Sequence, residues 1–199
     1  MSFLFEPENL LTKDGIAIYY GVVYPDKEAN QLCQQLFDTM PWKQDEVLMF
    51  GKMIITKRKV AWFADKGITY TYAGVKKTGF IWTDLLLDIK AKVESITGAH
   101  YNACLLNLYH EGEEGMGWHQ DNEVEMVAGS SIASLSLGAA RKFAFKHAST
   151  NERLDIELAN GSLLEMKGAI QENWYHSLPK TKKVKQMRIN LTFRLMHHQ

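Results

Sequence analysis

The residues with the clearest chemical potential lie in the segment EGMGWHQDNE, where His119 and Asp121 are two positions apart. If this segment is extended, both side chains project from the same side of the chain and can share one metal ion. A third ligand is needed, and His176 in the segment NWYHSLPK is the best candidate. Two histidines and one carboxylate form the facial triad of non-haem Fe(II) oxygenases, which leaves coordination positions open for other ligands.

Three alternatives compete with this metal site. A helix would pair His119 with Glu123 one turn later, although Gly115 and Gly117 directly before them disfavour a well-formed helix. A His-x-Asp pair is also compatible with an ordinary surface loop, so the pair gains weight only from the more distant His176 and the strand after it. The same three ligands could hold zinc for hydrolysis, which would leave two arginines of that later strand without a role.

The segment MRINLTFRL, residues 187–195, predicts a strand with two chemically different faces. Alternation places Arg188, Asn190, Thr192 and Arg194 on one face and apolar residues on the other. An edge strand that exposes polar groups to water would give the same pattern. Two arginines at this spacing also suit a dicarboxylate, because each guanidinium can bind one carboxylate through two hydrogen bonds.

The segment ACLLNLY predicts a second strand with polar groups on an otherwise apolar face. Leu105, Asn107 and Tyr109 share one face, while Cys104 and its alternate neighbours share the other. A buried amide and a buried phenol need hydrogen-bond partners. A bound polar ligand or the neighbouring backbone would supply them.

Two helices and about six short strands are expected to position these groups. Apolar residues recur every three or four positions over residues 26–40 and 83–97, and Gly98 follows the second helix. Asn160-Gly161 predicts a hairpin turn between two of the strands. Helices followed by strands indicate an α+β protein, with helices packed against a β-sandwich or barrel. Alternating patterns place the strands at residues 103–109, 131–138, 141–147, 153–158, 162–166 and 188–195.

Length and composition restrict the class of protein. The 199 residues predict one domain, 1–199, and no apolar run reaches the roughly 18 residues of a membrane span. The N-terminus carries early acidic residues rather than a basic signal-peptide start, and the two cysteines lie in apolar segments. We therefore expect an intracellular monomer, cytoplasmic if bacterial and nuclear if eukaryotic. The net charge is zero, but basic residues are concentrated in residues 52–77 and after residue 172. These segments are either solvated surface or a contact for a polyanion.

Five motifs resemble, in order and spacing, those of the AlkB family of Fe(II)- and 2-oxoglutarate-dependent DNA-repair dioxygenases. They are NLYHEGEEGMGWHQDNE, GSSIASLSLGAARKFAF, GSLLEMKG, NWYHSLPK and RINLTFR, within residues 70–195. The resemblance implies a double-stranded β-helix (jelly-roll) core at residues 100–196, N-terminal helices packed on one side, and a nucleotide-recognition lid at residues 46–80. It also implies the roles of eight residues: His119, Asp121 and His176 for iron, and Asn107, Tyr109, Arg188, Asn190 and Arg194 for 2-oxoglutarate.

Within the family, the chain is most similar to the branch that repairs alkylated bases in double-stranded DNA. The segment MFGKM resembles the intercalating hairpin of that branch, with Phe50 filling the gap left by a flipped base and Gly51 and Lys52 beside it. Without the resemblance, Phe50 would be taken for a buried hydrophobic residue.

The segment GITYTYAG resembles the lid over the flipped base. The resemblance implies that Tyr72, which shares a strand face with Tyr70, stacks on the base opposite His119. Arg58 matches a position near the opposite DNA strand, and Glu123 matches a position that reads the base edge. Without the resemblance, the two tyrosines would be assigned to the core or its rim.

The implied activity is oxidative demethylation of N-alkylated bases, for example 1-methyladenine or 3-methylcytosine, in DNA, with duplex DNA expected in preference to single-stranded DNA. Fe(II), 2-oxoglutarate and O2 are the implied cofactor and co-substrates, and formaldehyde, succinate and CO2 the products. Two alternatives remain at this stage: the same chemistry on RNA, nucleotides or proteins, and a jelly-roll module that binds without catalysis. Gln120 and Asn122 depart from the branch and put its base selectivity in doubt.

Overall fold

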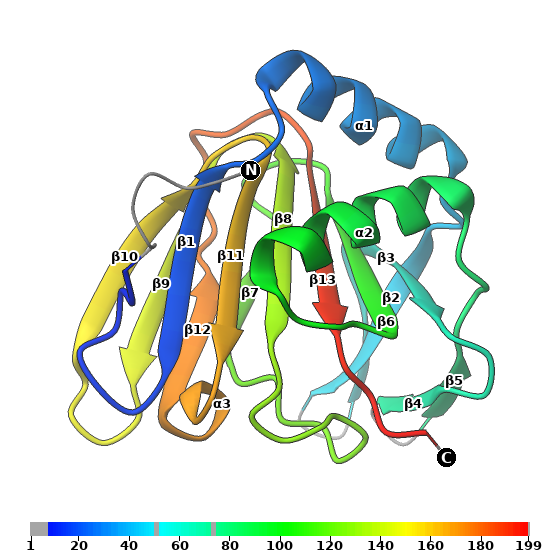
Figure 1. The fold of residues 1–199 in the computed structure, drawn as a ribbon. Coiled ribbons are helices and arrows are strands. Elements are labelled where there is room, and N and C mark those ends of the chain that lie inside the picture. Colours follow the sequence, from blue (N-terminus) through cyan, green and yellow to red (C-terminus); the bar gives the residue numbers. More distant parts are fainter. Residues whose placement is uncertain (1–7, 50–51, 73–74, 199) are drawn as a thin grey trace.

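The computed structural model describes residues 8–49, 52–72 and 75–198, with the side chains of 45–49, 52–54, 70–72 and 75–78 left out (Figure 1). A seven-stranded major sheet has the order β1-β11-β8-β13-β6-β3-β2, and a four-stranded minor sheet has the order β10-β9-β12-β7. The strands β4 and β5 form a separate pair. The strands are β1 (Ile16–Val22), β2 (Lys43–Met49), β3 (Lys52–Ala64), β4 (Thr69–Tyr72), β5 (Val75–Thr78), β6 (Ala103–Tyr109), β7 (Met116–His119), β8 (Ile132–Gly138), β9 (Arg141–His147), β10 (Arg153–Leu158), β11 (Ser162–Lys167), β12 (Trp174–Leu178) and β13 (Arg188–Arg194).

The chain winds between the two sheets from β8 onward. It passes from β8 in the major sheet to β9 and β10 in the minor sheet, then to β11, β12 and β13 in alternate sheets. The strand pairings between described residues of these two sheets are antiparallel. This winding gives the jelly-roll core, and the predicted α+β fold class is confirmed.

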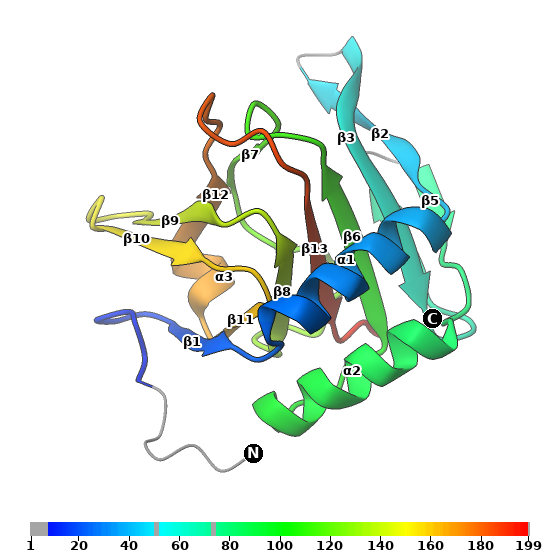
Figure 2. The same cartoon turned by 90° about the horizontal axis from the view of Figure 1, so that it is seen from above.

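The helices α1 (Asp26–Thr39) and α2 (Asp84–Thr97) cover the outer face of the major sheet, away from the minor sheet (Figure 2). Both agree with the periodicity of the sequence. Thr83 caps α2 by accepting a hydrogen bond from the Leu86 backbone N–H, and Gly98 ends it in the left-handed conformation with φ 68°. Neither helix, nor the short α3 (Ile170–Asn173), has the length and apolar character of a membrane span among the residues described.

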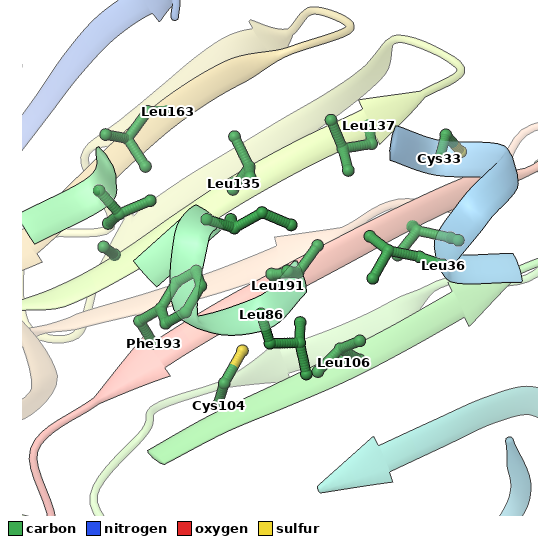
Figure 3. Packing of buried hydrophobic residues seen from close by; sticks show 14 of the residues in the cluster. Cys33, Leu36, Leu86, Cys104, Leu106, Leu135, Leu137, Leu163, Leu191 and Phe193 are labelled. Atoms are coloured by element: carbon green, nitrogen blue, oxygen red, sulfur yellow. The ribbon is translucent and has the colours of Figure 1, made fainter. Parts of the chain in front are cut away.

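One apolar cluster holds the helices on the sheet. Cys33 and Leu36 of α1 and Leu86 of α2 pack on side chains that alternate along the strands (Figure 3). Leu191 and Phe193 of β13 belong to this cluster, which fixes the opposite face of β13 toward the minor sheet. The burial of the apolar face therefore aims the polar face of the same strand into the space between the sheets.

The hairpin predicted at Asn160-Gly161 is wrong, because the two flanking strands, β10 and β11, belong to different sheets. The turn itself exists: Gly161 has φ +72°, and an added Cβ would lie 2.1 Å from the Tyr24 carbonyl oxygen. Asn160 accepts a hydrogen bond from the Gly138 N–H at 2.8 Å and donates to Asp26 Oδ1 at 3.0 Å. A turn signal specifies the local backbone and does not specify which sheet the next strand joins.

Several elements were not predicted from the sequence. The strands β1, β2 and β3 extend the major sheet at its two edges, and α3 is a single short turn of helix before β12. The register of β3 against β6, with Val60 opposite Asn107, depends on residues more than 40 positions apart. Such long-range pairing is weakly visible in local sequence patterns.

Candidate metal and co-substrate site

A cavity of about 230 Å³ lies between the two sheets, at the centre of the jelly roll. Ten residues proposed from the sequence as site residues lie on its wall, and they come from both sheets and the connecting loops. They are Arg58, Asn107, Tyr109, His119, Asp121, Glu123, His176, Arg188, Asn190 and Arg194. The structure thus brings together side chains that are up to 136 positions apart, as the difference between 194 and 58 shows.

Three of these residues form the candidate metal centre. His119 ends β7 and lies directly opposite His176 of β12 in the antiparallel register, which brings the ring centroids to 4.2 Å. The Nε2 atoms of His119 and His176 each lie 3.9 Å from an oxygen of Asp121. One ligand atom from each residue falls within 4.8 Å of the others. Because β7 is extended, the helical alternative that paired His119 with Glu123 is wrong.

Hydrogen bonds set the orientation of two of the ligands. Nδ1 of His119 lies 2.8 Å from the Gly117 carbonyl oxygen, which can only accept, so Nδ1 carries the proton and Nε2 is left as a ligand. The backbone N–H of Asp121 donates to Gln171 Oε1 at 2.8 Å, and Arg194 Nη2 donates to Asp121 Oδ1 at 2.9 Å. The loop that carries Asp121 is therefore fixed by α3 on one side and by β13 on the other.

The electrostatics favour the protonation states that a divalent metal needs. Burial opposes ionisation of Asp121, but Arg194 and the two histidines hold the pKa of this carboxyl below its ordinary value. Burial lowers the pKa of His176 to about 3, against the opposing attraction of Asp121. At neutral pH the triad therefore offers an anionic oxygen and a neutral imidazole, and two nitrogens with one carboxylate fit Fe(II).

The second part of the cavity contains buried polar atoms that have no partner among the described residues. Arg188 is 2 % exposed, and its Nη2 donates to Ser136 Oγ at 2.9 Å, whereas its Nε has no hydrogen-bond partner in the described part of the chain. Asn107 Oδ1 is likewise buried and unpaired among the described residues. Burial lowers the pKa of Arg188 to about 10, so the guanidinium is still protonated at neutral pH. A small anion with several acceptor oxygens fits this set.

The strand register explains why these groups converge. Arg188 lies opposite Tyr109, and Asn190 lies opposite Asn107, on the adjacent strands β13 and β6. The Arg188 guanidinium carbon is 5.5 Å from the centroid of the Tyr109 ring. Asn190 also donates to Ser134 Oγ at 2.8 Å, so β8 supports the same wall.

The remaining predicted residues fall in two groups. Arg194 Nη1 lies 3.7 Å from Glu123, so Arg194 contacts two acids beside the metal centre. Arg58 is 6 % exposed, and its Nη1 lies 3.4 Å from Met116 Sδ. Arg58 therefore lies in the cavity wall rather than on an outer surface. The second group is less fully placed: Lys52 begins β3 and Tyr70 and Tyr72 lie in β4, without described side chains, while Phe50 and Gly51 lie outside the described residues.

Two supporting residues were missed by the sequence analysis. Gln171 holds the Asp121 backbone, and nothing in its four-residue helix signals this role. Arg141 is 2 % exposed at the start of β9, and its Nη2 donates toward the carbonyl oxygens of Glu114 at 2.9 Å and Pro179 at 3.0 Å. It thereby joins the loop before β7 to the loop after β12. An arginine at the first position of an apolar strand was the available signal.

Comparisons with known proteins agree with this geometry. The family model described as the 2OG-Fe(II) oxygenase superfamily matches residues 15–194. The chain is 36% identical over 192 residues to the DNA oxidative demethylase ALKBH2 of Bos taurus, covering 91% of this chain and 69% of that protein. It is 32% identical over 191 residues to the alpha-ketoglutarate-dependent dioxygenase alkB homolog 3 of Homo sapiens, covering 92% and 66%. A solved structure titled "The structure of OsALKBH1" matches with a TM-score of 0.59 at 15% identity over 93% of this chain and 98% of that one, which bears on the fold alone.

Proposed function

The chain belongs to the 2OG-Fe(II) oxygenase superfamily, and on this premise we propose that it is a DNA oxidative demethylase that removes alkyl groups from N-alkylated bases. The family uses Fe(II), 2-oxoglutarate and O2. The observation that carries the proposal is the joint placement of the His119-Asp121-His176 triad and Arg188 on one cavity wall. The name DNA oxidative demethylase, borne by relatives 36% identical to the chain, supports DNA as the substrate.

The residues present fit the metal and the co-substrate. His119, Asp121 and His176 would hold Fe(II), and Arg188 with its neighbours on β6 and β13 would bind the 2-oxoglutarate carboxylate that points away from the metal. Bound Fe(II), 2-oxoglutarate and O2 together supply the oxidising power that hydroxylates a C–H bond, with succinate and CO2 as by-products. On an N-methyl base such as 1-methyladenine or 3-methylcytosine, the hydroxymethyl product loses formaldehyde and restores the base.

The protein's own contribution is positioning and exclusion of water. Phe143 stacks on the ring of His176 at 5.5 Å between centroids, and Leu178, Met116 and Trp62 add apolar wall around the triad. Glu123 lies in the same wall and can accept a hydrogen bond from the exocyclic amine of adenine or cytosine. The cavity therefore combines an apolar surround with a small number of polar groups, which suits recognition of one flipped base.

We propose further that the DNA substrate is double-stranded. Phe50, with Gly51 and Lys52, would fill the gap in the duplex, while Tyr70 and Tyr72 of β4 would cover the base, Tyr72 opposite His119. This step rests on the resemblance of the segments MFGKM and GITYTYAG. RNA, free nucleotides and proteins remain alternative substrates for the same chemistry.

The first experiment measures formaldehyde release from a duplex oligonucleotide with one 1-methyladenine, beside the same lesion in a single strand, with Fe(II), 2-oxoglutarate and ascorbate. Release from the duplex at or above the single-strand rate supports the proposal, and His119→Ala serves as the inactive control. If succinate forms but neither DNA releases formaldehyde, the oxygenase activity is supported and methylated DNA is rejected as the substrate.

The Phe50→Ala variant tests the duplex step. Because a single strand needs no gap filled, the variant is expected to lose activity on duplex DNA by at least tenfold more than on single-stranded DNA. Equal losses on the two substrates would contradict an intercalating role for Phe50.

A further inference from the structure

The outer face of the minor sheet carries an aromatic and basic surface that the cavity does not use. Trp118 of β7 is 42 % exposed, and its ring centroid lies 5.7 Å from Lys146 Nζ and 5.8 Å from Arg153 Cζ. Lys146 also lies 5.9 Å from the ring of Tyr175 on β12. We call Trp118, Tyr175, Lys146 and Arg153 the Trp118 surface.

The Trp118 ring and the Arg153 side chain approach each other across the minor sheet. Arg153 is on β10, three strands from β7, and three strand spacings are about 14 Å. The small residues Ala144 and Ser177 lie between and line a hollow beside Trp118. The aromatic ring and the neighbouring cations are thus carried by strands of one sheet. A planar group such as a nucleobase can stack on an exposed ring of this kind.

The cations of this surface lack acidic partners. Lys146 and Arg153 lie directly opposite each other in the antiparallel register, where like charges destabilise a sheet. Within the described part of the chain neither forms an ion pair, whereas the neighbouring Lys142 pairs with Asp155. Glu157 is a further acid on this side of β10, opposite Lys142 and four register pairs away from the opposed cations. Two cations that form no ion pair among the described residues, and that lie over an exposed ring at 5.7 and 5.8 Å from its centroid, complement a phosphate chain that carries planar bases.

The Trp118 surface adjoins the cavity. Met116 and Leu178 line both the cavity and the hollow beside Trp118. His119 and Trp118 are consecutive in an extended strand, so their side chains point to opposite sides of β7, which is an edge strand. A strand of DNA that delivers one base to His119 can therefore place nearby nucleotides over the β7 edge.

We propose that the Trp118 surface binds an unpaired segment of DNA flanking the target base, with a base stacked on Trp118 and phosphates on Lys146 and Arg153. This deepens the proposed demethylation of DNA and rests on it for the identity of the polymer. It concerns DNA with unpaired nucleotides beside the lesion, such as a single strand or a strand end, and not the fully paired duplex on which Phe50 would act. The bases of an intact duplex are already stacked on one another, so the surface selects unpaired nucleotides.

The test measures binding of an unmethylated, fluorescein-labelled oligothymidine of 12 nucleotides to the full chain by fluorescence anisotropy. Trp118→Ala is expected to weaken binding about tenfold, as loss of a stacking platform does. The double variant Lys146→Ala, Arg153→Ala is expected to reduce the slope of log affinity against log salt by about 1.4, because two phosphate contacts are lost. An unmethylated probe keeps this result independent of demethylation, so either proposal can fail alone.

Matched controls lie on α1, on the far side of the major sheet (Figure 2). Phe37, 39 % exposed, matches the exposure of Trp118, and Lys27 is an exposed lysine; Phe37→Ala and Lys27→Ala are expected to bind as the unaltered chain does. With a methylated substrate, the loss of kcat/KM in Trp118→Ala is expected to be larger for a 12-mer than for a trimer. Unchanged oligothymidine binding and an unchanged salt slope in the surface variants would overturn the proposal and leave the surface to a protein partner.

Discussion

Arg194 and Asp121 form a buried ion pair, with Nη2 2.9 Å from Oδ1, that joins the last strand of the major sheet to the loop carrying a metal ligand. The resemblance assigns Arg194 to the 2-oxoglutarate site, and in the structure Arg194 also contacts the metal ligand Asp121. The pair holds the pKa of Asp121 low and its carboxylate in one orientation. The folding of β13 against β6 therefore helps to position the ligand set.

Replacing His119 with alanine tests the metal centre with little risk to the fold. The His119 side chain is 32% exposed and ends an edge strand, so the variant is expected to unfold within a few degrees of the unaltered chain. Fe(II) binding, measured by anaerobic titration, and succinate formation should both be lost. Retained turnover would contradict the assignment of His119 as a ligand.

Replacing Gln171 with leucine tests the support of Asp121. The variant loses the hydrogen bond to the Asp121 N–H, and metal affinity is expected to fall roughly tenfold, as when outer partners of a ligand are removed. The measurement is an anaerobic Fe(II) titration, with the neighbouring exposed substitution Glu172→Gln as the control. Equal affinities in the two variants would mean that the loop is held without Gln171.

Replacing Arg188 with lysine tests the co-substrate site. A lysine keeps the charge but cannot form the paired hydrogen bonds of a guanidinium, so the KM for 2-oxoglutarate is expected to rise roughly tenfold to a hundredfold. Steady-state succinate formation at varied 2-oxoglutarate gives this value. Ser136→Ala, which removes one acceptor of Arg188, should raise KM by less; the reverse order would contradict direct binding by Arg188.

Replacing Arg141 with methionine tests the junction of the two loops around the cavity. The buried carbonyl oxygens of Glu114 and Pro179 would lose their donor, and the free energy of unfolding is expected to fall by about 3 kcal/mol. Urea unfolding monitored by circular dichroism measures the change. Arg141→Lys, which can restore one donor, should recover part of it.

Alkaline pH is expected to destabilise the fold through buried tyrosines. Burial raises the pKa of Tyr24 and of Tyr101 to about 12, against an unfolded value near 10. A raised pKa means that the folded protein binds more protons than the unfolded chain between these values, so the stability is present below pH 10 and is lost as pH rises toward 12. Urea unfolding at pH 9 to 12 tests this, and Tyr24→Phe should make the fall shallower.

Local sequence determined much of the site because strand geometry has a period of two. The alternation in residues 188–194 was enough to place Arg188, Asn190 and Arg194 on one face, since apolar burial of Leu191 and Phe193 leaves no other orientation. The helices at residues 26–39 and 84–97 were equally visible, because their apolar spacing and the glycine at 98 are local signals.

Only the tertiary structure decided which strands meet. His176 pairs with His119, and Gln171 accepts a hydrogen bond from the Asp121 backbone, although these segments are far apart in the chain. After Asn160 the chain leaves the minor sheet for the major sheet, which separates two strands that are neighbours in the sequence. These contacts form because the two sheets bury their inner faces against each other. The stabilisation comes from all the packed strands together, so the alternation within one strand does not show which other strand it will meet. The sequence by itself therefore specified the chemical groups and the faces that carry them, and packing of the sheets specified the cavity in which they meet.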